Sequence, residues 1–206
     1  MLRAQASDYP DRVNPGLRRG ALELRLWRAT DVDALAAAIA DSQDHLAPFM
    51  PWVAEEPLPR DRRLALIERW QQLAANGGDK VFGIWLDGTA VGGCGLHQRI
   101  GPGGLEIGYW VSRQVVRRRV AATTAALLTE EALSTPGIDR VEIHHAVENV
   151  ASAGVPRLLG YHRLPDTTGE PAVPGLSGRS AVWRLTGDCG PSVLAQLETF
   201  AVRPGD

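Results

Sequence analysis

The first half of the chain contains two spacings of apolar residues, one typical of a strand and one typical of helices. Residues 21–28, ALELRLWR, alternate apolar and polar positions as a half-buried strand does. A polar residue can cap a helix that follows over residues 31–42, and a second helix is predicted over 60–78, where a pair of glycines ends it. Prolines interrupt the segment 45–59 between these two helices.

Strand-like and helical segments alternate in the second half. The pair Asp87-Gly88 is typical of a tight hairpin turn between two strands. The predicted strands are residues 80–86, 89–100, 105–112, 137–147, 161–164 and 179–187, and the predicted helices are residues 120–134, 148–160 and 191–202. This order indicates one mixed α/β domain over residues 21–203, preceded by a flexible N-terminal arm over residues 1–20.

Composition argues against several classes of protein. The net charge is -2 and the pI is about 6.2, whereas a general nucleic-acid binder usually has a strongly basic domain. Cys94 and Cys189 have neither the spacing of a metal site nor that of a disulfide framework. No apolar run approaches the ~18 residues of a membrane span, and residues 1–20 lack the apolar core of a signal peptide. We therefore expect a cytoplasmic protein with no nucleic-acid partner, no membrane partner and no metal.

Three adjacent arginines, Arg117, Arg118 and Arg119, directly precede the helix that begins at Val120. Adjacent cations repel one another, and cations at a helix N-terminus oppose the helix dipole. Charge alone leaves two interpretations open. The arginines belong to a solvated helix start, or they help the unpaired N–H groups of the helix to hold an anion such as a phosphate.

An ordered set of motifs resembles a known family. The chain carries LEIGYWV at 105–111, then an arginine-containing loop and VAATTAALL at 120–128, then RVEIHHAVENVASAGVPRLLGY at 140–161. Together with LRLWRATDVDALAAAI at 24–39 and HLAPFMPW at 45–52, these segments resemble the GCN5-related N-acetyltransferases (GNAT), and most closely their RimJ/RimL branch. The likeness covers most of the chain.

This resemblance implies a fold and an activity. The fold is α/β (α+β): one domain with a mixed, strongly bent sheet of about seven strands, two of them splayed apart, and helices on both faces. The activity is direct transfer of an acetyl group from acetyl-CoA to a primary amine, either a protein N-terminus or a small molecule. The best-known members of the branch acetylate N-termini of ribosomal proteins. We expect a monomer or a homodimer.

The resemblance also implies where acyl-CoA binds. The backbone at the end of strand 105–112 would pair with the pantetheine arm, and the pyrophosphate would lie on the start of the helix at Val120. Asn149 and Ser152 match the Asn-x-x-Ser motif of the family, in which Asn contacts the cofactor and Ser lies near the sulfur. The implied cofactor-binding residues are Trp110, Val111, Ser112, Arg117, Arg118, Arg119, Val120, Ala121, Ala122, Asn149 and Ser152.

The phosphate loop departs from the family pattern, Gln/Arg-x-x-Gly-x-Gly/Ala. Here Val116 stands first, Arg119 occupies the glycine position and Ala121 stands last. Glycine suits such a loop because the backbone must approach phosphate closely. Two interpretations of this loop follow. The arginine side chains supply the charge that binds phosphate, or the chain is a GNAT-fold acyl-CoA-binding or regulatory protein with impaired catalysis.

Glu106 is the predicted catalytic base for the acceptor amine. It lies between apolar neighbours in the middle of a predicted strand, and amine attack on a thioester requires a group that takes a proton. The competing interpretation is a structural carboxylate paired with an arginine. Ser152 is the second predicted catalytic residue, as the group that assists the departing thiolate. Pro156 occupies the position where many relatives have a tyrosine acid, and Tyr161 is interpreted as a core residue.

Residues that line the acceptor pocket are predicted from two places. Phe49 and Trp52 lie in the proline-interrupted segment, and aromatic side chains there either pack on the core or form a wall of the pocket. His97 lies near the end of a predicted strand, while His144 and His145 are adjacent and therefore face opposite sides of their strand. The predicted substrate-binding residues are Phe49, Trp52, His97 and His145.

Overall fold

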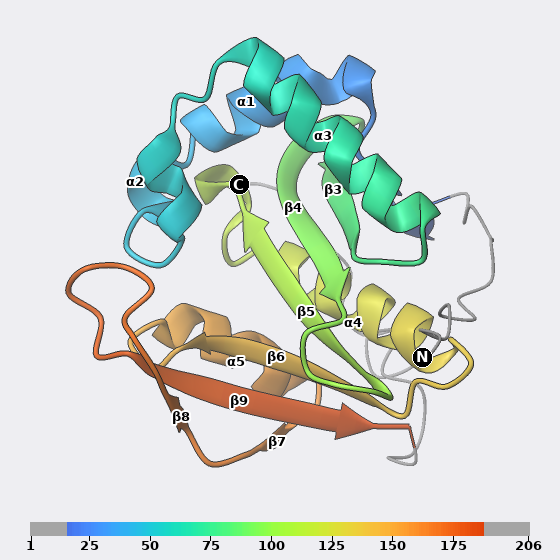
Figure 1. The fold of residues 1–206 in the computed structure, drawn as a ribbon, viewed down its shortest axis with the longest axis vertical. Helices are drawn as coiled ribbons and strands as arrows, with labels where there is room; N and C mark the ends of the chain where they lie inside the picture. The colour runs from blue at the N-terminus through green and yellow to red at the C-terminus, as the bar shows by residue number, and fades with distance from the viewer. Residues whose placement is uncertain (1–15, 188–206) are drawn as a thin grey trace, which may run out of the picture.

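A mixed sheet forms the centre of the computed structural model, which describes residues 16–187 (Figure 1). Its strands are β1 (Leu17–Arg19), β2 (Leu22–Leu26), β3 (Lys80–Leu86), β4 (Thr89–His97), β5 (Gly104–Val111), β6 (Arg140–Ala146), β7 (His162–Arg163), β8 (Thr167–Thr168) and β9 (Arg179–Thr186). They lie in the order β1-β2-β3-β4-β5-β6-β9-β7, and β8 pairs with β9. Strands β5 and β6 are parallel, and the other described pairs are antiparallel.

Helices cover both faces of this sheet. The α-helices are α1 (Val32–Ala40), α2 (Gln43–Leu46), α3 (Arg60–Ala75), α4 (Val120–Leu133) and α5 (Val150–Leu158), with short 3₁₀ helices η1 (Ala29–Asp31), η2 (Pro51–Glu55) and η3 (Arg113–Val115). Helix α1 contacts β4 and α3 contacts β3, whereas α4 contacts β5 and α5 contacts α4 and β6. Figure 1 shows α1 and α3 crossing in front of β3 and β4, with α4 and α5 behind the sheet.

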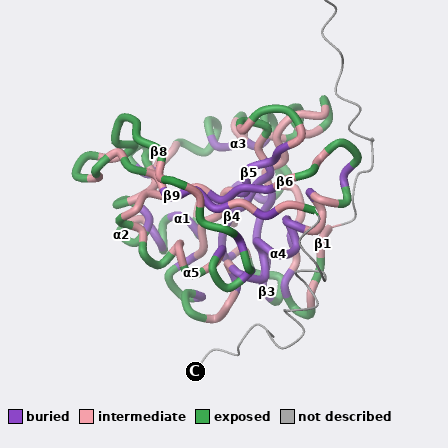
Figure 2. The backbone as a smooth tube through the Cα atoms, turned by 90° about the horizontal axis from the view of Figure 1, so that it is seen from below, coloured by how far each residue is buried: buried purple, intermediate pink, exposed green. Residues whose placement is uncertain are grey.

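The two faces are packed differently. Helix α4 is buried from Ala122 to Thr129 within the larger apolar core, and Figure 2 shows its buried colour over most of its length. On the opposite face, Trp27 and Trp85 centre a smaller core under α1 and α3, with ring centroids 5.5 Å apart. Farther along that face, β6 and β9 carry the ion pair of Glu142 and Arg184. The face under α1 and α3 therefore changes from apolar to charged toward β9.

The structure confirms a mixed α/β fold with helices on both faces, and the sheet is larger than expected. It has nine strands rather than about seven, because β1 and β8 span three and two residues and are too short to give a periodic pattern. Residues 17–19 form β1 and pair with β2, so they belong to the sheet rather than to the arm predicted for residues 1–20. The helix predicted over 191–202 lies outside the described residues. Within residues 16–187, no helix is both long and apolar enough to cross a membrane.

A buried ion pair fixes the first turn of α3 to the chain before it. The side chains of Arg63 and Glu56 are 3% and 6% exposed, and one guanidinium nitrogen lies 2.5 Å from a carboxylate oxygen. The Leu58 amide donates to the same carboxylate at 2.8 Å. Burial alone would raise the pKa of Glu56, but the bonds from Arg63 and Leu58 lower it below its ordinary value. The carboxylate is therefore charged in the folded protein at neutral pH.

We predict that Glu56→Ala destabilises the fold by about 3–5 kcal/mol, because it leaves the Arg63 guanidinium buried without its charge partner. Asp33→Ala is the matched control: it breaks an ion pair with Arg60 whose side chains are 74% and 66% exposed, and it should cost far less stability because solvent screens the pair. Urea unfolding at neutral pH measures both. Because folding lowers the pKa of Glu56, the charged carboxylate adds its full contribution to stability above the unfolded pKa of about 4.3. This contribution is lost as the pH falls below that value. Equal losses in the two variants would contradict the prediction.

Candidate functional site

The parallel pairing of β5 and β6 stops part-way along both strands. It covers only Gly104 to Glu106 on β5 and Arg140 to Glu142 on β6. Beyond these residues β5 continues beside β4 to Val111, and β6 continues beside β9 to Ala146. Figure 1 shows the two strands close together at their starts and well separated at their ends. The sheet therefore contains a splay that begins immediately after Glu106.

Backbone groups of β5 face this splay. The amide of Ser112 donates to the carbonyl of Val91 on β4 at 2.7 Å. Because the bonding direction alternates along an antiparallel pair, Trp110 also directs its backbone groups to β4, whereas Val111 and Tyr109 direct theirs toward β6. Of the three residues predicted to pair with a pantetheine arm, Val111 is therefore the one with outward-facing backbone groups.

The start of α4 lies at the wide end of the splay. Only η3 and residues 116–119 separate β5 from α4, and Figure 1 shows α4 beginning near the end of β5. Its N-cap residue, Arg119, makes no side-chain capping bond, and its first turn contains no acidic residue. The first amides of a helix have no intrahelical acceptor, so this end presents donors and partial positive charge. These features suit an anion.

The loop before α4 holds two arginines in a backbone conformation that favours glycine. Arg117 and Arg119 both have φ of 63°, in the left-handed region that is costly for residues with a Cβ. Arg119 occupies the position where the family pattern has glycine. The loop thus adopts a glycine-like conformation with arginine side chains, which is a strained arrangement of the kind found at functional sites.

On the α4 and α5 side, Tyr109 spans the splay and contacts Ser152. The phenol oxygen lies 3.0 Å from the Ser152 Oγ and 3.3 Å from its carbonyl oxygen. Asn149 caps α5, its side-chain oxygen accepting from the Ser152 amide at 3.1 Å. Burial raises the pKa of Tyr109 to about 12 although the bond with Ser152 opposes the shift. Tyr109 therefore keeps its proton, and a protonated phenol can donate to the serine oxygen.

On the opposite face, Glu106 lies in a cluster of charged side chains. Arg99 donates to both of its carboxylate oxygens, at 2.8 and 2.5 Å. His144 Nδ1 lies 3.8 Å from one of these oxygens, and its Nε2 lies 2.6 Å from Glu142. Glu106 is only 6% exposed, whereas the Arg99 side chain is 58% exposed. The arginine pairing considered for Glu106 is thus present, and the exposed arginine lies between the carboxylate and the surface.

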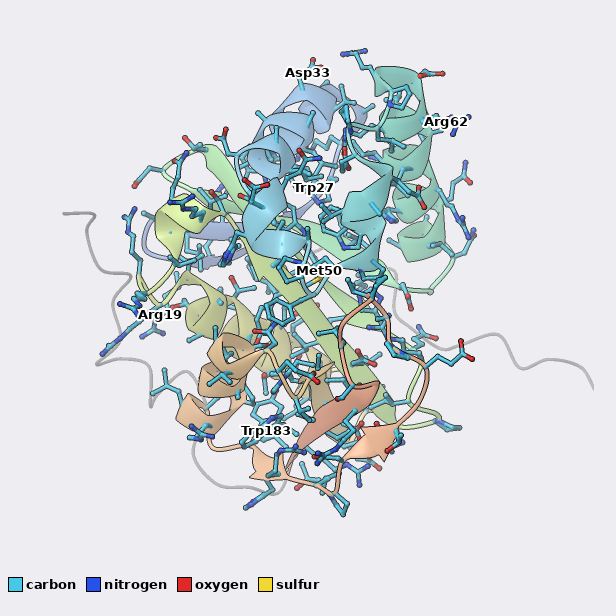
Figure 3. The ribbon with its side chains drawn as sticks, turned by 90° about the vertical axis from the view of Figure 1, so that its left-hand side faces the viewer. Arg19, Trp27, Asp33, Met50, Arg62 and Trp183 are labelled. Carbon is cyan, nitrogen blue, oxygen red and sulfur yellow. The ribbon has the colours of Figure 1, made fainter. Side chains whose placement is uncertain are left out.

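Aromatic side chains border the same face. Trp110 of β5 lies over Gly93 of β4, where a Cβ would come within 2.6 Å of the indole nitrogen. The Trp52 ring packs against Trp110 with centroids 5.8 Å apart. Phe49 is half-buried in the turn before η2. The neighbouring Met50 lies in Figure 3 between the α1–α3 layer and the half of the molecule that contains Trp183.

The structure brings some predicted residues together and separates others. His97 pairs in register with Glu106 and shares its face with Trp110, and Trp52 packs on Trp110. His145 faces the other side: its Nδ1 bonds the Ala146 carbonyl at 2.8 Å and its Nε2 accepts from the Trp183 indole at 3.0 Å. Burial lowers the pKa of His145, so it is a neutral residue with both nitrogens engaged.

Several residues at this site were not predicted. Arg99 follows His97 by two positions, so the period-two alternation of β4 could have placed it on the same face as Glu106. Asp79, which bonds His97, lies across the predicted β3–β4 hairpin, but a register shift at Ile84 and Trp85 hides the exact pairing from the sequence. The role of Tyr161 as a core residue is confirmed: it is 5% exposed, and its hydroxyl bonds Thr129 at 2.6 Å.

Comparison with known proteins identifies the family. The family model described as an acetyltransferase (GNAT) domain matches residues 21–162. The chain belongs to the GNAT acetyltransferases. A protein of Bacillus subtilis (strain 168) named "Putative ribosomal N-acetyltransferase YdaF" is 28% identical over 142 residues, 68% of this chain and 77% of that protein. The enzyme class predicted from the sequence, an N-acetyltransferase, is thereby confirmed.

Solved structures share the fold of this GNAT protein. RimL, a ribosomal L7/L12 alpha-N-protein acetyltransferase in complex with coenzyme A, has a TM-score of 0.75 over 84% of this chain and 97% of its own, at 18% identity. RimJ of Mycobacterium smegmatis, in complex with CoA-disulfide, has a TM-score of 0.75 over 86% of this chain and 88% of its own, at 21% identity. The likeness to the RimJ/RimL branch is confirmed at the level of the fold.

We predict that Arg119→Gly stabilises this GNAT fold by about 1 kcal/mol and weakens acetyl-CoA binding by about tenfold. Glycine relieves the left-handed conformation, part of the gain being offset by the greater freedom of the unfolded chain. The same change deletes a charge-assisted contact worth about 1.5–3 kcal/mol, which regained backbone donors replace only in part.

Arg118→Gly is the matched control, because Arg118 does not have a positive φ. It removes the same charge without relieving strain, so its thermal midpoint should not rise. Thermal unfolding and isothermal titration with acetyl-CoA measure the two effects separately. A tenfold gain in affinity for Arg119→Gly would instead identify the side chain as an obstruction.

Proposed function

We propose that this protein transfers the acetyl group of acetyl-CoA directly to the α-amino group of a protein N-terminus, with ribosomal proteins as the substrate class. The observation that carries this proposal is the splay that begins after Glu106. One opening in the sheet joins an anion-binding helix start on one side to a charged face bordered by aromatic rings on the other. Such an opening lets a phosphate-bearing donor and an amine acceptor meet from opposite directions.

The donor side fits acyl-CoA residue by residue. The start of α4 at Val120, Ala121 and Ala122 offers free amides, and the side chains of Arg117 to Arg119 offer charge for phosphates. Val111 offers backbone groups for the pantetheine amides, with Trp110 and Ser112 on either side. Asn149 and Ser152 lie at the start of α5, beyond the splay. The coenzyme A that the RimL and RimJ structures contain supports the same donor here.

The chemistry requires three proton movements. The acceptor arrives as an ammonium group and must lose one proton before nitrogen attacks the thioester carbonyl. Nitrogen then loses a second proton as the N–C bond forms and the C–S bond breaks, and the departing thiolate gains one. We assign Glu106 as a proton acceptor for the amine and Ser152, bonded to the Tyr109 phenol, as the donor to the thiolate. A backbone amide of β5 that faces the splay would polarise the carbonyl.

The acceptor assignment rests on the relatives and on the shape of the acceptor side. The Bacillus subtilis relative carries a ribosomal N-acetyltransferase name, and RimL is named for L7/L12. The acidic Glu106 and the half-buried rings of Trp52 and Trp110 suit a cationic amine on an otherwise uncharged peptide end. Such a substrate is consistent with the cytoplasmic location predicted from the sequence.

We predict that acetyl-CoA binds and that thiol is released when a peptide with a free N-terminus is added, including the N-terminal peptide of ribosomal protein L7/L12. Isothermal titration measures the first and a thiol reagent the second. Affinity should fall as salt is raised to about 1 M, where the Debye length is about 3 Å. Blocking the peptide N-terminus by prior acetylation is the control. Acetyl-CoA binding without turnover on any peptide or small amine would favour the regulatory alternative, and no binding would exclude both.

We predict that Glu106→Gln lowers kcat by about one to two orders of magnitude with little change in acetyl-CoA affinity, the effect of losing a proton acceptor. Glu142→Gln is the matched control, since Glu142 is 4% exposed on the same face and is likewise paired with an arginine, Arg184. Its loss should affect stability more than kcat. Equal kcat in the Glu106 variant and the parent protein between pH 6 and 9 would show that Glu106 takes no proton.

A further inference from the structure

His97 has its own carboxylate partner. Its Nδ1 lies 2.8 Å from Asp79 Oδ2, and the other oxygen of Asp79 accepts from the Gln98 amide at 2.9 Å. Burial alone would raise the pKa of Asp79, but the Gln98 amide, His97 and nearby Arg99 lower it. Asp79 is therefore a carboxylate and can only accept a hydrogen bond. The His97 Nδ1 must carry the proton of this bond.

This bond determines the state of the other ring nitrogen. With its proton on Nδ1, a neutral imidazole has an unprotonated Nε2 that accepts a proton. Among the described residues, Nε2 of His97 has no hydrogen-bond partner. The His97 side chain is 19% exposed, so a small group can reach it from the surface. A carboxylate that fixes the tautomer of a histidine is the arrangement that orients histidine bases in hydrolases.

Two glycines place this nitrogen at the start of the splay. A Cβ at Gly95 of β4 would come within 2.7 Å of Nε2, and one at Gly108 of β5 would come within 3.4 Å. The ring therefore lies over both strands, which glycine at these positions allows. Gly108 is two residues beyond Glu106, where the pairing of β5 with β6 has just ended. Nε2 thus lies beside the opening through which donor and acceptor would meet.

The polar atoms around and on His97 differ in whether they already have hydrogen-bond partners. Asp79 comes from the turn before β3, Arg99 follows β4, Glu106 comes from β5, and His144 of β6 lies behind Glu106. Both oxygens of Glu106 accept bonds from Arg99. On this face, Glu106 is therefore bonded by the Arg99 guanidinium, whereas Nε2 of His97 has no hydrogen-bond partner among residues 16–187.

We propose that His97 is a catalytic residue that accepts a proton from the acceptor amine through Nε2, and that Asp79 is its positioning residue. This inference rests on the proposed acetyl transfer. The amine loses two protons in that reaction. Glu106 takes one and His97 takes the other. One proton equivalent is regained by the departing thiolate, and the other passes to solvent.

The test compares pH–rate profiles of His97→Gln and the parent protein, with the L7/L12 N-terminal peptide as acceptor. We expect kcat/KM to fall by about 10- to 100-fold in the variant. The parent should lose activity on acidification, because a protonated imidazole cannot accept a proton from the amine, and the variant should lack this limb. Acetyl-CoA affinity should change less than twofold. His162→Gln, a substitution on exposed β7, is the control that should retain the profile of the parent.

A second variant keeps the ring and removes the charge that orients it. In Asp79→Asn the imidazole loses the carboxylate that fixes its tautomer, so kcat/KM should fall while acetyl-CoA affinity stays within twofold of the parent. Added imidazole should restore part of the activity of His97→Ala, because a free ring can occupy the space over the two glycines. A structural role for His97 would give no such rescue.

The outcomes separate this inference from the function on which it rests. If the parent protein binds no acetyl-CoA or acetylates no peptide, the proposed function fails and His97 has no role as a base. If the parent is active and His97→Gln keeps both its rate and its acid limb, the assignment of His97 is overturned while the function stands. A variant that loses acetyl-CoA affinity or thermal stability along with activity, without imidazole rescue in His97→Ala, would also overturn it.

Discussion

The end of the β5–β6 ladder at Glu106 and Glu142 is the constraint on which the rest of the site depends. Neither strand is free to follow the other, because β4 holds β5 to Val111 and β9 holds β6 to Ala146. The backbone groups left without a ladder partner are costly to bury, and a ligand with amide groups of its own can satisfy them. A gap in a sheet would destabilise a closed core, but it can be tolerated at a binding site because the ligand pairs with the exposed backbone groups. The Tyr109–Ser152 contact bridges the gap on one side.

The two faces of the sheet present different chemical groups at this gap. The face under α4 and α5 is an apolar core, and there Tyr109 holds its proton because of burial. The other face is covered by α1 and α3 only as far as β4, so Glu106 and His97 lie in a region that helices leave partly open. Tyr109 and Glu106 therefore lie on opposite faces of β5, three positions apart, so the groups proposed as proton donor and proton acceptor are kept on opposite sides of the sheet.

Sequence patterns predicted the long elements and the order of the family motifs because periodicity accumulates over many residues. They missed β1 and β8, which are short and are held by pairing with β2 and β9 rather than by any local pattern. Glu106 was predicted as buried and chemically important, and pairing with an arginine was one of two open interpretations; which arginine it is, Arg99, came from the structure. The predicted hairpin brings the residue before β3 near the end of β4, but a register shift at Ile84 and Trp85 decides that Asp79 lies beside His97. A bulge of this kind leaves no pattern in the sequence, so the general neighbourhood could be predicted and the exact partner could not.

The arginines before α4 show how local strain bears on function. Glycine at position 119 would adopt φ of 63° without cost, and arginine does so at an expense of about 1–2 kcal/mol. Folding alone therefore favours glycine there. Because real proteins violate local rules mainly at functional sites, the retained side chain is best explained by what it contributes to a ligand. The phosphate-bearing donor proposed above would supply that explanation, because the guanidinium would add charge that a glycine loop obtains only from its amides.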